Sequence, residues 1–377
     1  MIIFHISGVC FGRFMSFLTI RQIQWSFACT RRRIIIMHMA DALLSPAVAG
    51  TMYVASAVAG AYSIHEIKKN EDFKKKIPTM GVMGAFVFAT QMVNFTIPGT
   101  GSSGHLCGGV LLSSILGPYA GFLSMIGVLL IQCLFFADGG ILALGANCFN
   151  MAFYGCFIGS IIWQLIMKNG MSKRKITISS ISGSIISLLL GAFSVTVETL
   201  LSDITQLSFK AFVGAMLPIH LVIGLVEGLI SAAVLCFVYE ARPDILWNPW
   251  DSDNKEKINK ISYGKFIAVM SAMFLIIGGG ISLAASQNPD GLEWSILRLT
   301  GDTKTLGYED KIHDSASQIQ DKTSFLPDYS FKDNDTWKGT TVSGIVGGIV
   351  TVAVICGAGY LIRFSQRKRK SDDDEQD

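Results

Sequence analysis

The sequence predicts an all-α polytopic membrane protein, in which a seven-helix domain is followed by a two-span helical hairpin with an extracytoplasmic loop. Half of the 377 residues are hydrophobic, the mean hydropathy is +0.47 and only 16% are charged, whereas soluble domains carry about 25% charged residues. The apolar residues also gather in runs long enough to cross a bilayer. A globule of this size has too little interior for them. These observations exclude a soluble enzyme, a nucleic-acid-binding module and a disordered scaffold, and a net charge of +3 indicates no nucleic-acid partner.

Nine apolar segments are predicted to be helices. The first opens with Ser45-Pro46, an N-cap followed by a first-turn proline. The third has about a dozen residues, fewer than the roughly 20 that cross a bilayer, so it is either a short buried crossing helix or a re-entrant segment. The predicted helices are 45–65, 78–97, 105–117, 118–137, 145–167, 176–200, 211–239, 262–285 and 341–363.

Four clusters of Lys and Arg orient these segments, because such clusters mark cytoplasmic loops. Two cytoplasmic clusters must be separated by an even number of membrane crossings. Between the clusters at 68–76 and 168–175, the number of crossings is even only if 105–117 crosses. The residues before Ser45, the loop at 98–104 and the polar stretch 286–340 then share the outer side, and the C-terminus is cytoplasmic. The clusters lie within 68–76, 168–175, 242–265 and 363–370.

A polar, Pro-interrupted stretch at 241–261 divides the chain into two domains. We expect 37–240 to form the first membrane domain, 241–261 a cytoplasmic linker, 262–365 a two-span domain and 366–377 a charged cytoplasmic tail. No internal repeat is evident, so an inverted-repeat carrier gains no support.

Residues 1–36 fit neither a membrane span nor a signal peptide, because Arg residues are scattered through them. A second methionine, Met37, follows at once. We expect translation to start at Met37 and the first 36 residues to reflect a start assigned too early; a retained extension and an unusual leader are the alternatives.

A chain that begins Met37-His38 is a chelator. Its α-amine, the His38 amide nitrogen and one His38 imidazole nitrogen form fused five- and six-membered rings. One further imidazole completes a square of four nitrogens, which suits Ni(II) or Cu(II), and related geometries accept Co(II).

His105 is the best candidate for the fourth nitrogen. It follows the Gly-rich loop at 98–104, which lets the backbone fold closely around a small ligand, and that loop shares the predicted outer side with Met37. His105 is expected to open the short helix. A solvated or helix-capping His105 and a coincidental Met-His pair are the alternatives to a metal site.

Four blocks of sequence resemble the CbiM/NikM family, the substrate-capture membrane components of cobalt and nickel transporters of the energy-coupling-factor type. The resemblance covers about 37–240, and it implies that Co²⁺ or Ni²⁺ is the transported ion. It implies as ligands the amine of Met37, backbone and side-chain nitrogens of His38, and His105. It also implies a transmembrane coupling subunit and two cytoplasmic ATPases as partners. The blocks are MHMADALLSP at 37–46, VNFTIPGTGSSGHLCGG at 93–109, LLIQCLFFADGGILALGANCFNMAFYG at 129–155 and HLVIGLVEGLI at 220–230.

The second domain is similar to the PDGLE-type, CbiN/NikN-like two-span partner of these transporters. NPDGLEW at 288–294 and LPDYSF at 326–331 carry this resemblance. It implies that the second domain helps to load the metal from outside.

Several polar residues near the predicted site have more than one interpretation. Asp41, Asn94, Asp138, Asn147 and Asn150 are candidates for ordering the ligand segments. Asp138 is alternatively a solvated turn or part of a metal entry route. The asparagines in the fifth span alternatively bond within their own helix.

His220 and Glu227 lie two helical turns apart on one face. Ionisable residues within a membrane usually face the bundle interior or a partner, so interhelical structure or coupling is favoured over direct metal binding. The remaining histidines are expected on solvated surfaces; they are His5, His65 and His313.

The chain contains no G-x-x-x-x-G-K-[ST] phosphate loop, so ATP hydrolysis belongs to other subunits, and neither enzymatic activity nor an organic cofactor is expected. The predicted function is capture of Co²⁺ or Ni²⁺ at the outer side of the cell (inner) membrane. The alternatives are a structural or assembly protein that anchors the external loop, and an ion-coupled secondary metal carrier.

Overall fold

The computed structural model describes residues 38–70, 73–204, 207–250, 260–301, 310–331 and 337–374, with side chains up to Gln366. The expectations for residues 1–36 and for Met37 lie outside the described residues. The elements, in chain order, are η1 (Asp41–Leu43), α2 (Pro46–Lys68), α3 (Phe73–Gln91), β1 (Phe95–Ile97), β2 (Ser102–Gly104), α4 (Gly109–Leu116), α5 (Pro118–Phe136), α6 (Leu144–Asn147), η2 (Cys148–Ile158), α7 (Gly159–Met167), α8 (Lys173–Leu201), α9 (Phe209–Ala241), η3 (Pro243–Ile245), α10 (Tyr263–Gly279), η4 (Ile281–Ala284), α11 (Gly291–Thr300), α12 (Lys311–Thr323), η5 (Pro327–Tyr329) and α13 (Trp337–Asp374).

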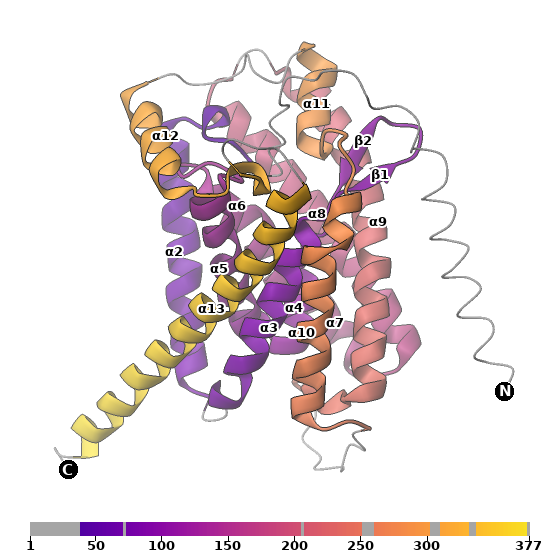
Figure 1. Cartoon of the computed structure of the whole chain (residues 1–377), viewed down its shortest axis with the longest axis vertical. Coiled ribbons are helices and arrows are strands. Elements are labelled where there is room, and N and C mark those ends of the chain that lie inside the picture. The colour runs from indigo at the N-terminus through magenta and orange to yellow at the C-terminus, as the bar shows by residue number, and fades with distance from the viewer. Residues whose placement is uncertain are drawn as a thin grey trace, which may run out of the picture. The chain divides into compact units, whose positions relative to one another are not determined.

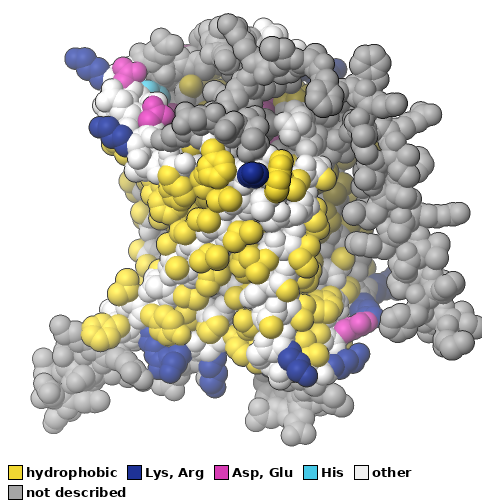
Figure 2. All heavy atoms as spheres, viewed as in Figure 1, with side chains coloured by type: hydrophobic (Ala, Val, Ile, Leu, Met, Phe, Trp, Pro, Cys, Tyr) yellow, Lys and Arg dark blue, Asp and Glu magenta, His cyan; other side chains and the backbone are white. Residues whose placement is uncertain are grey.

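Seven of the described helices are long and apolar enough to cross a membrane. They expose large apolar side chains, such as Val54 at 64% and Leu165 at 70%, as helices that face lipid do. Figure 2 shows a broad apolar band, with most of the visible Lys and Arg gathered at its lower end. The predicted all-α polytopic membrane fold is confirmed. The seven helices are Pro46–Lys68, Pro118–Phe136, Leu144–Met167, Lys173–Leu201, Phe209–Ala241, Tyr263–Ala284 and Trp337–Gln366.

Helices α3 and α4 lie inside the bundle. Every residue of α4 is buried, and so is every residue of α3 from Thr79 onward. α3 packs against α10 and α13, from the second predicted domain, and against α5 from the first (Figure 1). A methyl group added at Gly84 of α3 would lie only 2.3 Å from the Ile355 side chain of α13. The two predicted domains therefore share one hydrophobic core.

The predicted helix at 78–97 is wrong at its C-terminal end. α3 ends at Gln91, and Phe95–Ile97 pairs with Ser102–Gly104 in a two-stranded antiparallel hairpin. The connecting turn uses Gly99 and Gly101, whose φ angles of 78° and 75° are left-handed and favour glycine.

The prediction that His105 opens a helix is also wrong. α4 begins at Gly109, because Gly108 has a left-handed φ of 84°. The Glu227 carboxylate of α9 accepts the backbone N–H groups of Cys107 and Gly108 at 2.9 and 3.1 Å. Residues 105–108, which follow the hairpin, are therefore not helical.

The segment 105–117 still connects the two ends of the bundle. A helix of eight residues rises about 12 Å, so α4 alone does not span a bilayer. Its last carbonyl, that of Leu116, accepts a hydrogen bond from Lys76 Nζ at 3.3 Å, and the Ser114 carbonyl accepts one from the Trp247 backbone at 2.9 Å. The segment therefore ends where the Lys-rich start of α3 lies, which favours a buried crossing over re-entry.

The predicted helices at 145–167 and 262–285 are each built from more than one helical form. The first consists of α6, the π-helix η2 and α7, and the second of α10 and η4. The wide turn of the π-helix brings Gly155 against α4: a Cβ added at Gly109 would lie 2.7 Å from the Gly155 Cα. At the C-terminus, α13 continues as a helix to Asp374, so the predicted tail begins inside this helix.

Residues 310–331 of the second domain lie over the end of the first domain that contains His38. His313, on α12, is 7% exposed, so the expected solvated position is wrong, whereas His65 is exposed as expected and His5 is outside the described residues. The His313 Nε2 lies 3.0 Å from the Leu44 carbonyl oxygen, and its Nδ1 lies 2.8 Å from Asp310 Oδ1. Because both oxygens only accept, both ring nitrogens donate and the imidazole is protonated.

The close contact between α10 and α13 makes a first prediction. A Cβ at Gly344 would lie 2.0 Å from the Gly278 carbonyl oxygen, so we expect Gly344→Ala to separate the two helices and lower the free energy of unfolding by about 1–3 kcal/mol. Thermal unfolding in detergent measures this. Gly357→Ala, on the same helix but with open space around it, is the control and should be neutral. Equal Tm values for the two variants would contradict the close packing.

His313 makes a second prediction. Burial lowers the pKa of its imidazole, but the Asp310 carboxylate and the Leu44 and Asp41 carbonyls outweigh this effect and raise the pKa. Its stabilising effect is therefore complete below the unfolded value of about 6.5 and is lost as pH rises through the folded pKa. We expect the difference in Tm between the parent protein and His313→Gln to be largest near pH 5.5 (about one unit below that value) and to shrink as pH rises. The Asp41 carboxylate also faces His313, so a difference in Tm that grows with pH would assign the effect to another group.

Candidate metal-binding site

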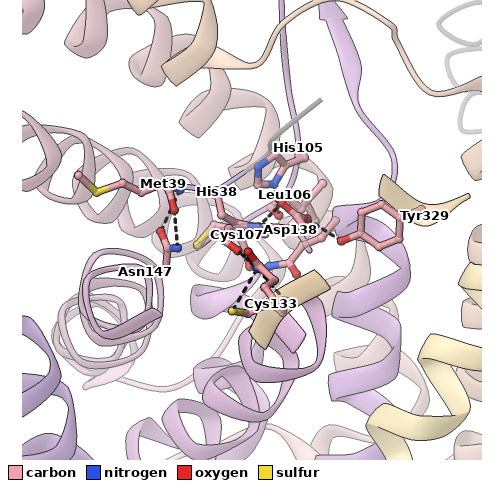
Figure 3. A network of polar contacts seen from close by, with 12 residues as sticks. His38, Met39, His105, Leu106, Cys107, Cys133, Asp138, Asn147 and Tyr329 are labelled. Carbon is pink, nitrogen blue, oxygen red and sulfur yellow. Dashed lines mark hydrogen bonds and ion pairs between the residues drawn. The ribbon is translucent and has the colours of Figure 1, made fainter. Parts of the chain in front are cut away.

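His38 and His105 come from distant segments and meet at one end of the bundle (Figure 3). His38 precedes the short 3-10 helix η1, and His105 lies between β2 and α4. Their ring centroids are 5.5 Å apart, with an angle of 60° between the ring planes. His38 is only 3% exposed, and its Nε2 has no hydrogen-bond partner in the described part of the chain.

Asp138 is buried beside His38. Its Oδ1 lies 2.8 Å from the His38 Nδ1, and its Oδ2 accepts a hydrogen bond from the Tyr329 hydroxyl at 2.6 Å. Burial alone raises the pKa of the carboxyl, but the neighbouring His38 and the hydrogen bonds outweigh this effect, so the pKa of Asp138 lies below its usual value. The solvated-turn interpretation of Asp138 is therefore wrong, because this side chain is 4% exposed.

The backbone next to His38 is held by Asn147 of α6. The Asn147 Oδ1 accepts the Met39 N–H at 3.1 Å, and its Nδ2 donates to the Met39 carbonyl at 3.1 Å. The same carbonyl also accepts the Gly140 N–H at 3.1 Å. Two residues further, the Asp41 carboxylate accepts the Ala143 N–H at 2.8 Å. The segment that carries His38 is thus tied to the loop and turn that follow α5.

The other two asparagines lie differently. Asn150 lines the cavity described below, but it donates to Glu198 Oε2 at 2.9 Å, a contact between η2 and α8. Asn94 precedes β1, does not line that cavity, and its carbonyl accepts the backbone N–H of Ser286 at 2.8 Å. The structure therefore brings Asp41, Asp138 and Asn147 to the His38 segment, but not Asn94.

A cavity of about 100 Å³ extends from the two histidines into the bundle. His220 and Glu227 of α9 both line it. Glu227 binds the backbone that follows His105, as described above, and the His220 Nδ1 donates to the Met216 carbonyl at 2.8 Å. Both residues thus make structural contacts. The His220 imidazole and the Glu227 carboxylate also border the cavity next to the histidine pair.

The PDGLE motif closes this cavity from the second domain. Asp290 and Gly291 line the space, and a Cβ at Gly291 would lie 3.0 Å from the His220 ring. The Pro289 carbonyl accepts the Ser103 N–H of β2 at 2.8 Å, and the Trp294 indole donates to the Thr100 carbonyl at 2.9 Å. The motif therefore packs directly on the hairpin that precedes His105.

Sequence reasoning did not find the contributions of Asp290, His313 and Tyr329. Asp290 carries a local signal, since Asp-x-x-Glu at 290–293 is an N-cap pattern, and its Oδ1 does accept the Glu293 N–H at 2.8 Å. His313 and Tyr329 lie in polar stretches where only long-range contacts reveal their burial.

The described side chains alone do not form a complete metal centre. Among the described residues, no three His, Cys, Asp or Glu side chains are arranged to hold a metal ion. What the structure presents is a pair of imidazoles with a carboxylate behind one of them.

Comparison with known proteins matches both parts of the chain to described families. Residues 38–245 match the family model CbiM, described as the cobalt uptake substrate-specific transmembrane region, and residues 264–364 match the PDGLE domain. A relative in Archaeoglobus fulgidus, named as a fused nickel transport protein NikMN, is 32% identical over 84% of this chain and 96% of its own length. The cobalt transport protein CbiM of Sorangium cellulosum is 27% identical over 56% of this chain and 94% of its own length.

A solved structure, described as a truncated transition metal transporter, is 34% identical to this chain; the match covers 54% of this chain and 99% of the other, with a TM-score of 0.48. The family match covers more than half of the 377 residues and includes both histidines of the pair. This chain is therefore an integral membrane protein of the CbiM family, with a PDGLE domain fused after it.

Proposed function

We propose that this chain captures Co²⁺ or Ni²⁺ at the outer face of the cell membrane, as the substrate-specific component of an ATP-driven energy-coupling-factor transporter. The observation that carries the proposal is the meeting of the buried His38 with the half-buried His105 over a cavity, with the His38 Nε2 unpartnered among the described residues. Buried polar atoms without partners are rare, and neutral imidazoles are the side chains that late first-row metals favour.

The proposed ligand set is the amine of Met37, the amide and imidazole nitrogens of His38, and His105. The family match begins at His38, which supports a functional chain that starts at Met37. A six-membered chelate ring that includes the ion and the His38 amide nitrogen can close only through the Nδ1 of the His38 imidazole. Because this atom now faces Asp138, the imidazole must turn about its Cβ–Cγ bond when the ion binds. A set of nitrogens also disfavours Mg²⁺ and Ca²⁺, which prefer oxygen.

Asp41, Asp138 and Asn147 are proposed to order this ligand segment through the contacts described above. Asn94 and Asn150 act further away, on the hairpin and on α8. His220 and Glu227 are proposed to connect the site with the interior of the bundle, because both border the cavity below the histidines.

The proposed partners are a transmembrane coupling subunit and two cytoplasmic ATPases. Relatives named for nickel transport and for cobalt transport support the choice of ions. The Lys-rich end of the bundle is proposed to face the cytoplasm, which puts His38, His105 and the segment 286–331 outside. The PDGLE domain is proposed to help the ion reach the site.

A third prediction tests the ligands. In a chain expressed from Met37, we expect His38→Ala and His105→Ala each to weaken Co²⁺ or Ni²⁺ binding by more than about 100-fold, measured by titration calorimetry on the purified protein. His65→Ala, on the exposed end of α2, is the control. Unchanged binding in either site variant would leave the structural or assembly role as the better interpretation.

A fourth prediction tests the free amine. Adding one residue before Met37 blocks the five-membered chelate ring, so we expect it to abolish tight binding and to change the absorption spectrum of bound Co²⁺. Binding that survives the extension would instead assign the ion to the imidazole pair alone, with Nδ1 of His38 remaining on Asp138.

A fifth prediction tests the energy source. We expect metal uptake by cells that express this chain to require the ATPase subunits and to persist when the proton gradient is dissipated at constant ATP. Uptake that needs the gradient but no ATPase would favour an ion-coupled carrier.

A further inference from the structure

The outer segment 310–331 makes polar contacts with the first domain from His313, Gln320, Leu326 and Tyr329. His313 binds the carbonyls of Leu44 and Asp41, and the Gln320 amide donates to the Gly139 carbonyl at 2.7 Å. Tyr329 donates to Asp138. The Gln320 amide also donates to the Cys133 carbonyl at 3.0 Å, and the Leu326 N–H donates to the Phe135 carbonyl at 3.2 Å. The contacts therefore fall on the stretch that carries His38, on the end of α5 and on the loop after α5 that carries Asp138.

Tyr329 is built into its position by its own turn and by neighbouring rings. It is 8% exposed, and its ring stacks on Phe136 with centroids 4.9 Å apart. Both Asp328 and Tyr329 have left-handed φ angles, 51° and 56°, a conformation that side chains other than Gly seldom adopt. The turn therefore accepts unfavourable backbone angles while it directs the hydroxyl group into the first domain.

Asp138 links this hydroxyl to the ligand. A carboxylate rotates about its terminal bond unless its oxygens are held separately. Here Tyr329 occupies Oδ2, and the His38 Nδ1 lies against Oδ1. With one oxygen fixed from the second domain, the direction of the other toward the imidazole is fixed as well.

We propose that Tyr329 is a positioning residue of the ion site, which acts through Asp138 to orient the His38 imidazole. This inference rests on the proposed function. In the orientation that the structure shows, Asp138 is the acceptor for the His38 Nδ1 proton, and outer acceptors of this kind orient imidazoles at metal sites. Tyr329 therefore fixes the position from which the His38 ring turns to bind the ion. The PDGLE domain thereby supplies part of the ion site itself, in addition to any part in delivering the ion.

The experiment compares Tyr329→Phe with Tyr263→Phe in the full chain expressed from Met37. Tyr329→Phe keeps the stacked ring and removes only the donor. Tyr263, in the same domain, donates or accepts a hydrogen bond with Thr79 at 2.8 Å, far in sequence from Asp138. We expect Tyr329→Phe to weaken Co²⁺ affinity by about 10–100-fold and to shift the visible absorption bands of the bound ion, while Tyr263→Phe changes neither.

A double-mutant cycle separates positioning from general stability. If Tyr329 acts only through Asp138, then Tyr329→Phe adds no further loss of affinity in an Asp138→Ala background. Unchanged affinity in the single variant, or losses that multiply in the double variant, would overturn the proposal. Gln320→Leu, which loosens the same loop at Gly139, provides a second variant and is expected to weaken affinity less.

A metal-free readout distinguishes this proposal from the proposed function. With ¹⁵N-labelled histidine, Tyr329→Phe should move the imidazole resonances of His38 but not those of His65. If the parent chain binds neither Co²⁺ nor Ni²⁺ yet the His38 resonances move, the proposed function fails and with it the ion site, although the contact of Tyr329 with Asp138 still orients the His38 ring. If the parent binds the ion and the His38 resonances do not move, the positioning role fails alone.

Discussion

The position of His38 in the candidate site depends on the contacts that hold residues 38–45, a segment with almost no regular secondary structure. Residues 38–45 contain only the short turn η1, so most of their backbone groups lack the regular partners of a helix. Asn147 supplies both an acceptor and a donor to Met39, and Asp41 accepts from Ala143. All of these partners belong to the loop and turn after α5. The position of His38 relative to His105 therefore follows from how this loop folds.

That loop is held from two directions. From below, α5 packs on α3 in the shared core. From above, Gln320 and Tyr329 bind Gly139 and Asp138. Buried polar contacts of this kind gain strength from their surroundings, and each is costly to leave half made. The fused domain thus contributes to the site at the level of individual hydrogen bonds as well as through its packed helices.

The long helices were predictable because their apolar runs exceed the thickness of a bilayer. The proximity of His105 to His38 was predictable from the outer side that their segments were expected to share. The strand Phe95–Ile97 was not, because its residues continue the apolar pattern of α3; its pairing depends on Gly99 and Gly101 and on the contact of Ser103 with Pro289. His313 and Tyr329 look like ordinary residues of a polar loop. Their burial comes from partners at Leu44 and Asp138, which no local pattern encodes.

The central place of α3 also bears on biosynthesis. This helix leaves the ribosome early, yet α10 and α13, which cover much of its surface, are made much later, and α13 is the last helix of the described chain. Chains emerge from the N-terminus onward, so the face of α3 that α10 and α13 cover is without these partners until the last of the two helices has been made.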